Sequence, residues 1–283
     1  MTPKAASFFA DTGFAARIER AESELIRAGA EAVRRRNPEA GVLTVPIAGG
    51  VAVWAERDSP LNKVAGLGFA GAPGEGELDA LERVFDERST PVRVELASLA
   101  GPEVTARLAR RGYLFVGFEN VLGLPLRDRQ PSPLPAGVDI AESGMEEFDE
   151  WLDVVVTGFA HPDDQGVPSD EEFSREVLER VMRDVASAAG FSRYLARRGG
   201  EIAGGASLRM GDGVAQLSGA ATLPAHRRQG VQTALLLARL DLARAAGCDI
   251  AVVTTQPGSK SQENVQRQGF HLLYTRAVLI RER

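Results

Sequence analysis

The stretch TLPAHRRQGVQTALL, residues 222–236, decides how this chain is interpreted. A strand-like run, Val214–Thr222, leads into it, and an apolar helical pattern continues from Gly230 to about residue 246. Arg227 and Arg228 stand between the strand and the helix. The first turn of a helix exposes N–H groups without partners and carries the positive end of the helix dipole. A loop of this composition therefore suits a pyrophosphate, which backbone amides would surround and guanidinium groups would neutralise.

A second stretch, SKSQENVQRQGF at residues 259–270, indicates a short polar helix that ends in a Gly-Phe turn into the last strand. The two stretches together resemble the GNAT superfamily of N-acetyltransferases, whose phosphate loop follows the pattern Arg/Gln-x-x-Gly-x-Gly/Ala. Here Gln232 replaces the final small residue. The resemblance implies acetyl-CoA as co-substrate, no metal, and cofactor-binding positions at Thr222, Leu223, Arg227, Arg228, Gln229, Gly230, Val231, Gln232, Thr233, Ser261, Asn264 and Arg267.

The same resemblance implies that the cofactor strand and the following strand splay apart, with the pantetheine arm in the gap between them. The departure at Gln232 leaves two possibilities. If this side chain points outward, the cradle of amides is intact. If it points inward, it crowds the pyrophosphate.

The arrangement of expected elements predicts a mixed α/β fold of α+β type rather than a doubly wound sheet. Antiparallel hairpins precede a strand-helix-strand-helix-strand tail in the second half of the chain. We expect two tandem GNAT-like domains, each a mixed, mostly antiparallel sheet flanked by helices. Residues 1–126 form a degenerate domain without a phosphate loop, the proline-rich residues 127–137 form a linker, and residues 138–283 form the acetyl-CoA-binding domain.

An internal repeat supports this division. An offset of 157 residues places Gly112-Tyr113 on Gly269-Phe270 and extends without a gap across a helix-strand-helix-strand segment. With the same offset, the positions of Arg227, Gly230 and Gln232 are occupied in the first half by Ala70, Pro73 and Glu75. Each replacement removes anion binding, because an arginine and a free amide are lost and a carboxylate is gained. We therefore predict one cofactor site per chain, in the second half.

The catalytic acid and base are harder to assign. Many members of the family carry a glutamate on the central strand, where this chain offers Gln216 and Ser218, and a tyrosine at the position of Val265. Tyr274 is a further candidate, although we favour the interpretation of a packed aromatic residue with its hydroxyl in solvent. The loop residues His161, Asp163 and Asp164 either border the acceptor or simply cap helices in solvent.

The predicted function is N-acetyl transfer from acetyl-CoA to a primary amine of a small molecule or peptide by direct attack. Three alternatives stay open: a non-catalytic acyl-CoA-binding or sensor protein, a transferase with another acyl donor, and a likeness of fold alone without CoA binding. The net charge of -6, the pI near 5.3 and the single cysteine, Cys248, predict a cytoplasmic protein without nucleic-acid or membrane partners. A duplicated chain can satisfy internally the interface that single-domain relatives form between subunits, which favours a monomer over a homodimer.

Overall fold

The computed structural model describes residues 9–161, 167 and 173–282. Their strands form one mixed sheet of eleven strands in the order β1-β2-β3-β4-β11-β5-β10-β9-β8-β7-β6. Only the pairs β3–β4 and β9–β10 are parallel, so the sheet is mostly antiparallel. The predicted fold class is confirmed, with the difference that the sheets of the two halves are joined into one.

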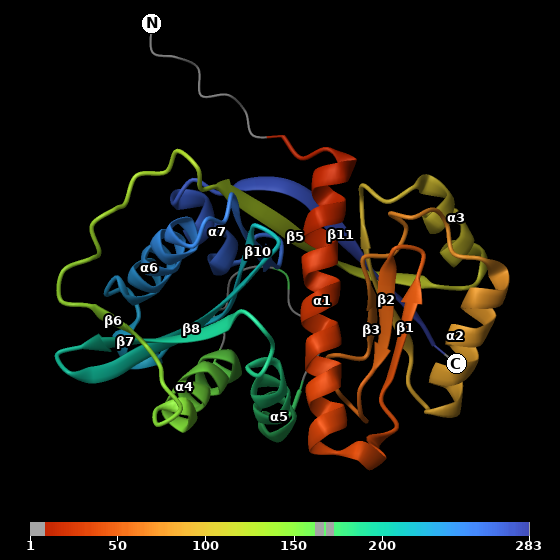
Figure 1. Cartoon of the computed structure of the whole chain (residues 1–283), viewed down its shortest axis with the longest axis horizontal. Helices are drawn as coiled ribbons and strands as arrows, with labels where there is room; N and C mark the ends of the chain where they lie inside the picture. Colours follow the sequence, from red (N-terminus) through yellow and green to blue (C-terminus); the bar gives the residue numbers. More distant parts are fainter. Residues whose placement is uncertain (1–8, 162–166, 168–172, 283) are drawn as a thin grey trace, which may run out of the picture.

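The first half of the chain contributes three helices, a short 3₁₀ turn and five strands. They are α1 (Thr12–Arg36), η1 (Pro38–Ala40), β1 (Leu43–Ile47), β2 (Gly50–Trp54), β3 (Lys63–Ala65), α2 (Glu75–Glu87), β4 (Val92–Ala97), α3 (Pro102–Arg110) and β5 (Leu114–Pro125). α1 packs against β2 and β3. The apolar faces of α2 and α3 pack on the strand side chains of the first half, among them Trp54 and Leu96, and form one core with them. In Figure 1, α1 lies on one side of strands β1–β3, and α2 and α3 lie on the other.

The second half repeats the pattern. It contains β6 (Asp139–Glu142), α4 (Phe148–Ala160), α5 (Arg175–Val185), β7 (Phe191–Arg198), β8 (Glu201–Gly211), β9 (Val214–Thr222), η2 (Pro224–His226), α6 (Val231–Ala245), β10 (Ile250–Thr255), α7 (Lys260–Arg267) and β11 (His271–Arg281). α4 and α6 both contact β8 and β9 and lie on opposite faces of them (Figure 1). α5 begins after its N-cap residue Ser174, whose hydroxyl accepts from the Val177 amide, and it ends at the C-cap residue Ala186.

The last strand of each half lies inside the sheet of the other half. β5 pairs with β10 of the second half, and β11 pairs with β4 of the first half. β5 and β11 also pair with each other, and they cross behind α1 from one half to the other in Figure 1. Neither half therefore completes its sheet with its own chain.

The register between β5 and β11 shows that this exchange is reciprocal. Phe118 pairs with Ala277 and Asn120 pairs with Thr275, and the 157-residue offset converts each of these pairs into the other. Glu119 pairs with Arg276, which occupies the equivalent position in the second half. An approximate twofold axis thus passes between Glu119 and Arg276.

Charged side chains gather at this axis although it is buried. The Arg276 guanidinium, only 2% exposed, lies 2.8 Å from a Glu19 oxygen, 3.5 Å from a Glu119 oxygen and 4.0 Å from a Glu95 oxygen. The ammonium of Lys63 lies 2.6 Å from Glu95. Burial, together with repulsion by Glu95, raises the pKa of Glu119 to about 7, and burial raises the pKa of Glu19. This cluster links both halves through opposite charges that are removed from water.

α1 fills the seam between the two halves. Asp11 caps its first turn by accepting from the Phe14 amide at 2.8 Å. Ile18 packs with β9 and β10 of the second half, whereas Ile26 packs with β2 of the first half and with Val181 of α5. One long helix thereby brings side chains of the first half to the strands of the second. No helix among the described residues is long and apolar enough to span a membrane.

Candidate functional site

The central strands β9 and β10 separate after three residue pairs. Val214, Ala215 and Gln216 pair with Ile250, Ala251 and Val252, and beyond these residues the two strands have no further pairing. β9 stays paired with β8, with an irregularity beside Ser218–Ala221 where Gly219 takes a φ of +59°. The result is a V-shaped opening in the sheet, as the resemblance implied.

The start of α6 lies beside this opening and has no side-chain cap. Gly230 is the N-cap residue with a φ of +80°, a conformation that suits glycine, and no side chain of residues 9–161, 167 or 173–282 bonds to the amides of the first turn. That first turn contains no acidic residue. The amides and the positive end of the helix dipole are thus available to an anion.

A groove of about 1270 Å³ runs from this helix start along the opening. Its cations are Arg227 and Arg228 at one side and Lys260 and Arg267 on α7 at the other. The described residues that line it include no Asp or Glu. Lys260 and Arg267 both form ion pairs with Glu263, which reduces their charge toward the groove, and Arg227 donates to the His161 carbonyl. The groove is suited to a long anionic ligand.

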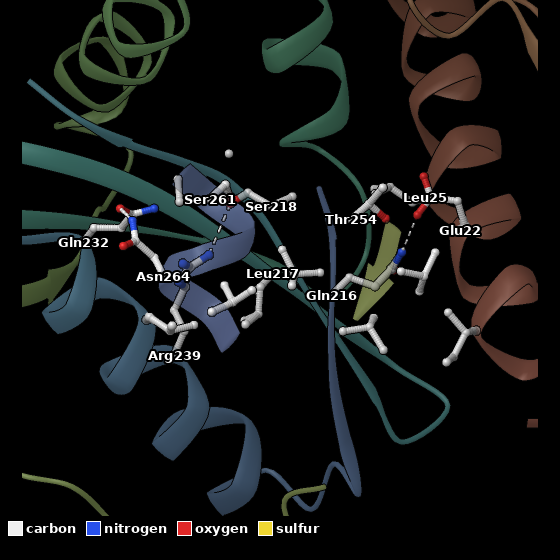
Figure 2. Close-up of a pocket in the computed structure, with 18 of the residues that line it drawn as sticks. Glu22, Leu25, Gln216, Leu217, Ser218, Gln232, Arg239, Thr254, Ser261 and Asn264 are labelled. Atoms are coloured by element: carbon white, nitrogen blue, oxygen red, sulfur yellow. Dashed lines mark hydrogen bonds between the residues drawn. The ribbon is translucent and has the colours of Figure 1, made fainter. Parts of the chain in front are cut away.

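A smaller cavity of about 310 Å³ continues inward from the groove. The two share the lining residues Phe159, Ala220, Gln232, Thr233, Thr254, Ser261 and Asn264. Figure 2 shows Gln232 and Asn264 at one end of this cavity, and Gln216 with Glu22 of α1 at the other. A ligand that passes between β9 and β10 therefore arrives at a chamber that both halves of the chain line.

Gln232 points across the groove rather than away from it. Its Oε1 accepts a hydrogen bond from the Asn264 side-chain amide at 2.5 Å, so the two side chains bridge α6 and α7. With the 157-residue offset, the counterparts of Gln232 and Asn264 are Glu75 and Arg107, which form an ion pair at 3.4 Å. The same bridge is thus neutral in the second half and charged in the first.

The equivalent region of the first half is sealed. Glu77 accepts from the Gly74 amide at 2.6 Å and so caps the start of α2. Arg111 forms ion pairs with Glu75, Asp79 and Glu82 at 2.8, 2.5 and 2.6 Å. These contacts join α2 to the α3 end, and they place carboxylates where α6 has an uncapped start.

Most of the predicted cofactor positions lie together around the groove. They are Thr222, Arg227, Arg228, Gly230, Val231, Gln232, Thr233, Ser261, Asn264 and Arg267, joined by His161. Leu223 and Gln229 are not among the lining residues: the Leu223 amide donates to Ala203, and the Gln229 side chain donates to Ala225. Asp163 and Asp164 lie outside the described residues.

The three catalytic candidates are separated by the structure. Gln216 and Ser218 line the inner cavity. The Ser218 hydroxyl lies 2.9 Å from that of Ser207, and its carbonyl accepts from Arg239. Tyr274 lines neither the cavity nor the groove; it is 4% exposed and donates to Glu19 at 2.7 Å. Burial raises the pKa of the Tyr274 phenol, which disfavours it as a proton carrier.

Sequence reasoning missed all three charged residues that are described as lining the inner cavity: Glu22, Arg239 and Arg276. Glu22 comes from α1, some 190 residues before the strands that it faces, so no local pattern connects it to them. Arg239 lies on the inner face of α6, where an apolar side chain is usual. Its guanidinium donates to the carbonyls of Leu235, Ser207 and Ser218, and burial lowers its pKa to about 10. This arginine ties α6 to β8 and β9 where the sheet opens.

Comparison with known proteins agrees with this geometry. The family model described as Acetyltransferase (GNAT) family matches residues 158–270, which contain the groove and its phosphate-loop pattern. Residues 158–270 are a GNAT domain. No curated protein matches the chain.

Solved structures resemble the chain over nearly its whole length. A GCN5-related N-acetyltransferase from Kribbella flavida aligns with a TM-score of 0.64 at 20% identity, covering 94% of this chain and 95% of that one. A tandem GNAT protein from the clavulanic acid biosynthesis pathway aligns with a TM-score of 0.61 at 17% identity, covering 96% and 94%. A GCN5-related N-acetyltransferase from Sphaerobacter thermophilus aligns with a TM-score of 0.56 at 15% identity, covering 97% and 94%. At these identities the likeness concerns the fold, and it extends over both halves of the chain.

Proposed function

We propose that this chain transfers an acetyl group from acetyl-CoA to a primary amine of a small molecule or peptide. The uncapped start of α6 carries this proposal, because it opens onto a cation-lined groove without carboxylates among its described lining residues. An acyl-CoA presents its negative charge on phosphates and its thioester at the end of a thin, uncharged arm. The outer groove carries four cationic side chains, and the residues of β9 and β10 that line the opening behind it are uncharged.

The diphosphate of the donor would be bound by the amides at Gly230 and Val231, with Arg227 and Arg228 beside them. The pantetheine arm would lie in the opening, where β9 beyond Gln216 has amide and carbonyl groups that β10 does not bond. Ser261 and Asn264 line this path from the α7 side. Entry of the arm would require the Gln232–Asn264 bridge to open or to turn its polar atoms toward the ligand.

We also propose a single donor site for each chain, in the unit formed by residues 138–283, with residues 127–137 as the connection to a first unit that binds no CoA. The capping of α2 by Glu77 and the ion pairs of Arg111 support this, since they occupy the groups that α6 leaves open. The connecting segment lies along α6, where Arg129 pairs with Asp241.

The chemistry follows from the amine and the thioester. The neutral amine nitrogen attacks the thioester carbonyl carbon, the carbon–sulfur bond breaks, and the proton lost by nitrogen is matched by the one gained by the CoA thiolate. Backbone amides of β9 near its irregularity at Gly219 would stabilise the oxyanion. The side chains mainly position the amine and remove its proton.

One observation favours a second candidate, a protein that binds acyl-CoA without catalysis. Along β9 the inner cavity has only the uncharged polar side chains of Gln216 and Ser218, and α7 carries Val265 where many relatives have a tyrosine. Release of CoA thiol in the presence of amines separates the two candidates.

Isothermal titration of CoA with paired variants tests the proposed site. Arg227→Glu removes a cation beside the helix start and adds a repelling charge, and we expect the affinity to fall by about 100-fold, equivalent to about 3 kcal/mol. Ala70→Glu introduces the same carboxylate at the equivalent exposed position of the first half, and we expect no change in affinity. An unchanged Kd in Arg227→Glu, or an equal loss in both variants, would contradict the assignment.

A further inference from the structure

Glu22 brings a carboxylate from the first half of the chain into the chamber of the second half. It lies on α1, is partly exposed, and lines the inner cavity together with Leu25 and Ile18. Among the described residues that line this cavity, Glu22 is the one acidic side chain. Figure 2 shows it facing Gln216 of β9 across the end of the cavity.

Hydrogen bonds hold this carboxylate in one orientation. Arg209 donates to Gln216 Oε1 at 2.7 Å, which turns the amide so that its Nε2 donates to Glu22 Oε2 at 3.1 Å. No hydrogen bond to Glu22 Oε1 is formed within the described part of the chain. The glutamine on the central strand thus serves to orient a glutamate from another element and leaves one carboxylate oxygen available to the cavity.

The other charges of the cavity already have partners. Arg239 donates to three carbonyl oxygens, and Arg276 lies among Glu19, Glu95 and Glu119. The charged groups that influence Glu22 are the cations Arg209, Arg276 and Lys63 and the anion pair Glu19 and Glu119. A ligand that enters from the groove therefore meets one carboxylate with an available oxygen, and an ammonium group is the natural complement.

We propose that Glu22 is the catalytic residue that binds the acceptor as its ammonium ion and takes one proton from it. This rests on the proposed acetyl transfer and names the group that selects the acceptor. The ammonium gives a proton to the Glu22 carboxylate, which becomes a carboxylic acid, and the neutral amine attacks the thioester carbon. The carbon–sulfur bond breaks, the second proton of the nitrogen passes to the thiolate, and Glu22 releases its proton to solvent. The products are an amide, CoA thiol and one proton.

Three variants of the full chain test this role. Glu22→Gln keeps the shape and removes the charge. Glu24→Gln is the matched control, since Glu24 lies on the same helix, forms an exposed pair with Arg27 at 3.0 Å and lines neither cavity. Glu22→Gln/Gln216→Glu exchanges the two side chains that are in contact and returns the carboxylate to the central strand.

The measurements are CoA affinity, CoA thiol release from acetyl-CoA, and calorimetric binding of amines to protein saturated with CoA. The amines are n-butylamine, cadaverine, glucosamine and a lysine-containing tripeptide, with 1-butanol as the uncharged analogue. We expect at least one amine to bind and react. Glu22→Gln should weaken its binding at least tenfold and lower kcat/KM by about 100-fold or more, with CoA affinity unchanged. Glu24→Gln should match the wild type, and the exchanged double variant should recover part of the loss.

The outcomes separate the two proposals. If the wild type does not bind CoA, the proposed acetyl transfer fails, and amine binding to the free protein still tests Glu22. If CoA binds but none of the amines does, or if Glu22→Gln binds and acetylates an amine as the wild type does, the role of Glu22 is overturned and the cofactor site is unaffected. If amine binding depends on Glu22 but no CoA thiol is released, the role of Glu22 in binding the amine is supported and the proposed acetyl transfer is contradicted.

Discussion

In the proposed phosphate site of the second half, Gln232→Glu should introduce the carboxylate that Glu75 supplies at the equivalent position of the first half. Gln232 is the second residue of α6, so a carboxylate there lies within about one helical turn, 5.4 Å, of the uncapped amides. At a distance of about 8 Å and an effective dielectric constant of about 20, each charge of a diphosphate would be repelled by about 2 kcal/mol. Salt screening reduces the sum for two charges to about 2 kcal/mol, which corresponds to a loss of affinity of about 30-fold.

The same variant should leave the free protein as stable as the wild type or slightly more so. A carboxylate in the first turn of a helix interacts favourably with the dipole, by about 0.3–1 kcal/mol, and Glu75 occupies this position in α2. The expected signature is therefore weaker CoA binding together with an unchanged or higher unfolding free energy, measured by calorimetry and urea denaturation. A general loss of structure would lower both quantities.

Two further variants complete this experiment. Gln232→Glu/Asn264→Arg recreates the Glu75–Arg107 pair of the first half, and we expect CoA affinity to stay low because the ion pair closes the groove. Gln266→Glu adds the same charge on the exposed side of α7, away from the groove, and should bind CoA as the wild type does. CoA binding that is undiminished in Gln232→Glu would refute the assignment of the α6 start to the diphosphate.

Three more predictions concern the residues that hold the site together. Arg276→Met should lower the unfolding free energy by about 3–5 kcal/mol at pH 8, because the buried carboxylates of Glu19 and Glu95 and the partly buried carboxylate of Glu119 lose their shared cation. The loss should be smaller at pH 5, because Glu119, whose pKa is about 7, is protonated there. Urea denaturation at both pH values measures this, and equal losses would contradict it. The pKa of Glu119 is raised to about 7 from the ordinary 4.5, so the protonated form that stabilises the fold is lost as pH rises through 7. Between pH 4.5 and 8 the unfolding free energy of the wild type should therefore fall by about 3 kcal/mol relative to that of Glu119→Gln. A parallel pH profile of the two proteins would show that Glu119 does not titrate in this range. Gly219→Ala should cost about 1 kcal/mol or more, since a Cβ at φ +59° would lie 2.8 Å from the Ser207 hydroxyl, and thermal unfolding that is unchanged would argue against the strained turn in β9.

The family could be predicted from sequence, and the half that we propose to bind the cofactor could be singled out, because the signals for both are local. A strand, a glycine-containing basic loop and an apolar helix follow one another within about thirty residues, and each has its own short-range pattern. The repeat was also visible, since the offset of 157 residues needs only a comparison of positions. The prediction that the first half has no anion site rests on Ala70, Pro73 and Glu75.

The conformation of Gln232 could not be predicted in this way. Two orientations were open, and the choice depended on Asn264, which is held at bonding distance only when α6 and α7 pack side by side. Tyr274 shows the same limit, because its place in a strand was readable but its contact with Glu19 of α1 was not.

By itself, then, the sequence determined which half carries the phosphate loop, where the elements lie and how the two halves correspond, because these depend on residues a few positions apart. Only the tertiary structure decided that β5 and β11 exchange places, that Arg276 meets Glu119 at the axis of the repeat, and that Glu22 faces Gln216. Strand order and contacts between distant residues follow from how buried surfaces fit together in the whole chain. Since no local pattern encodes that fit, the carboxylate of the inner cavity became visible only in the folded protein.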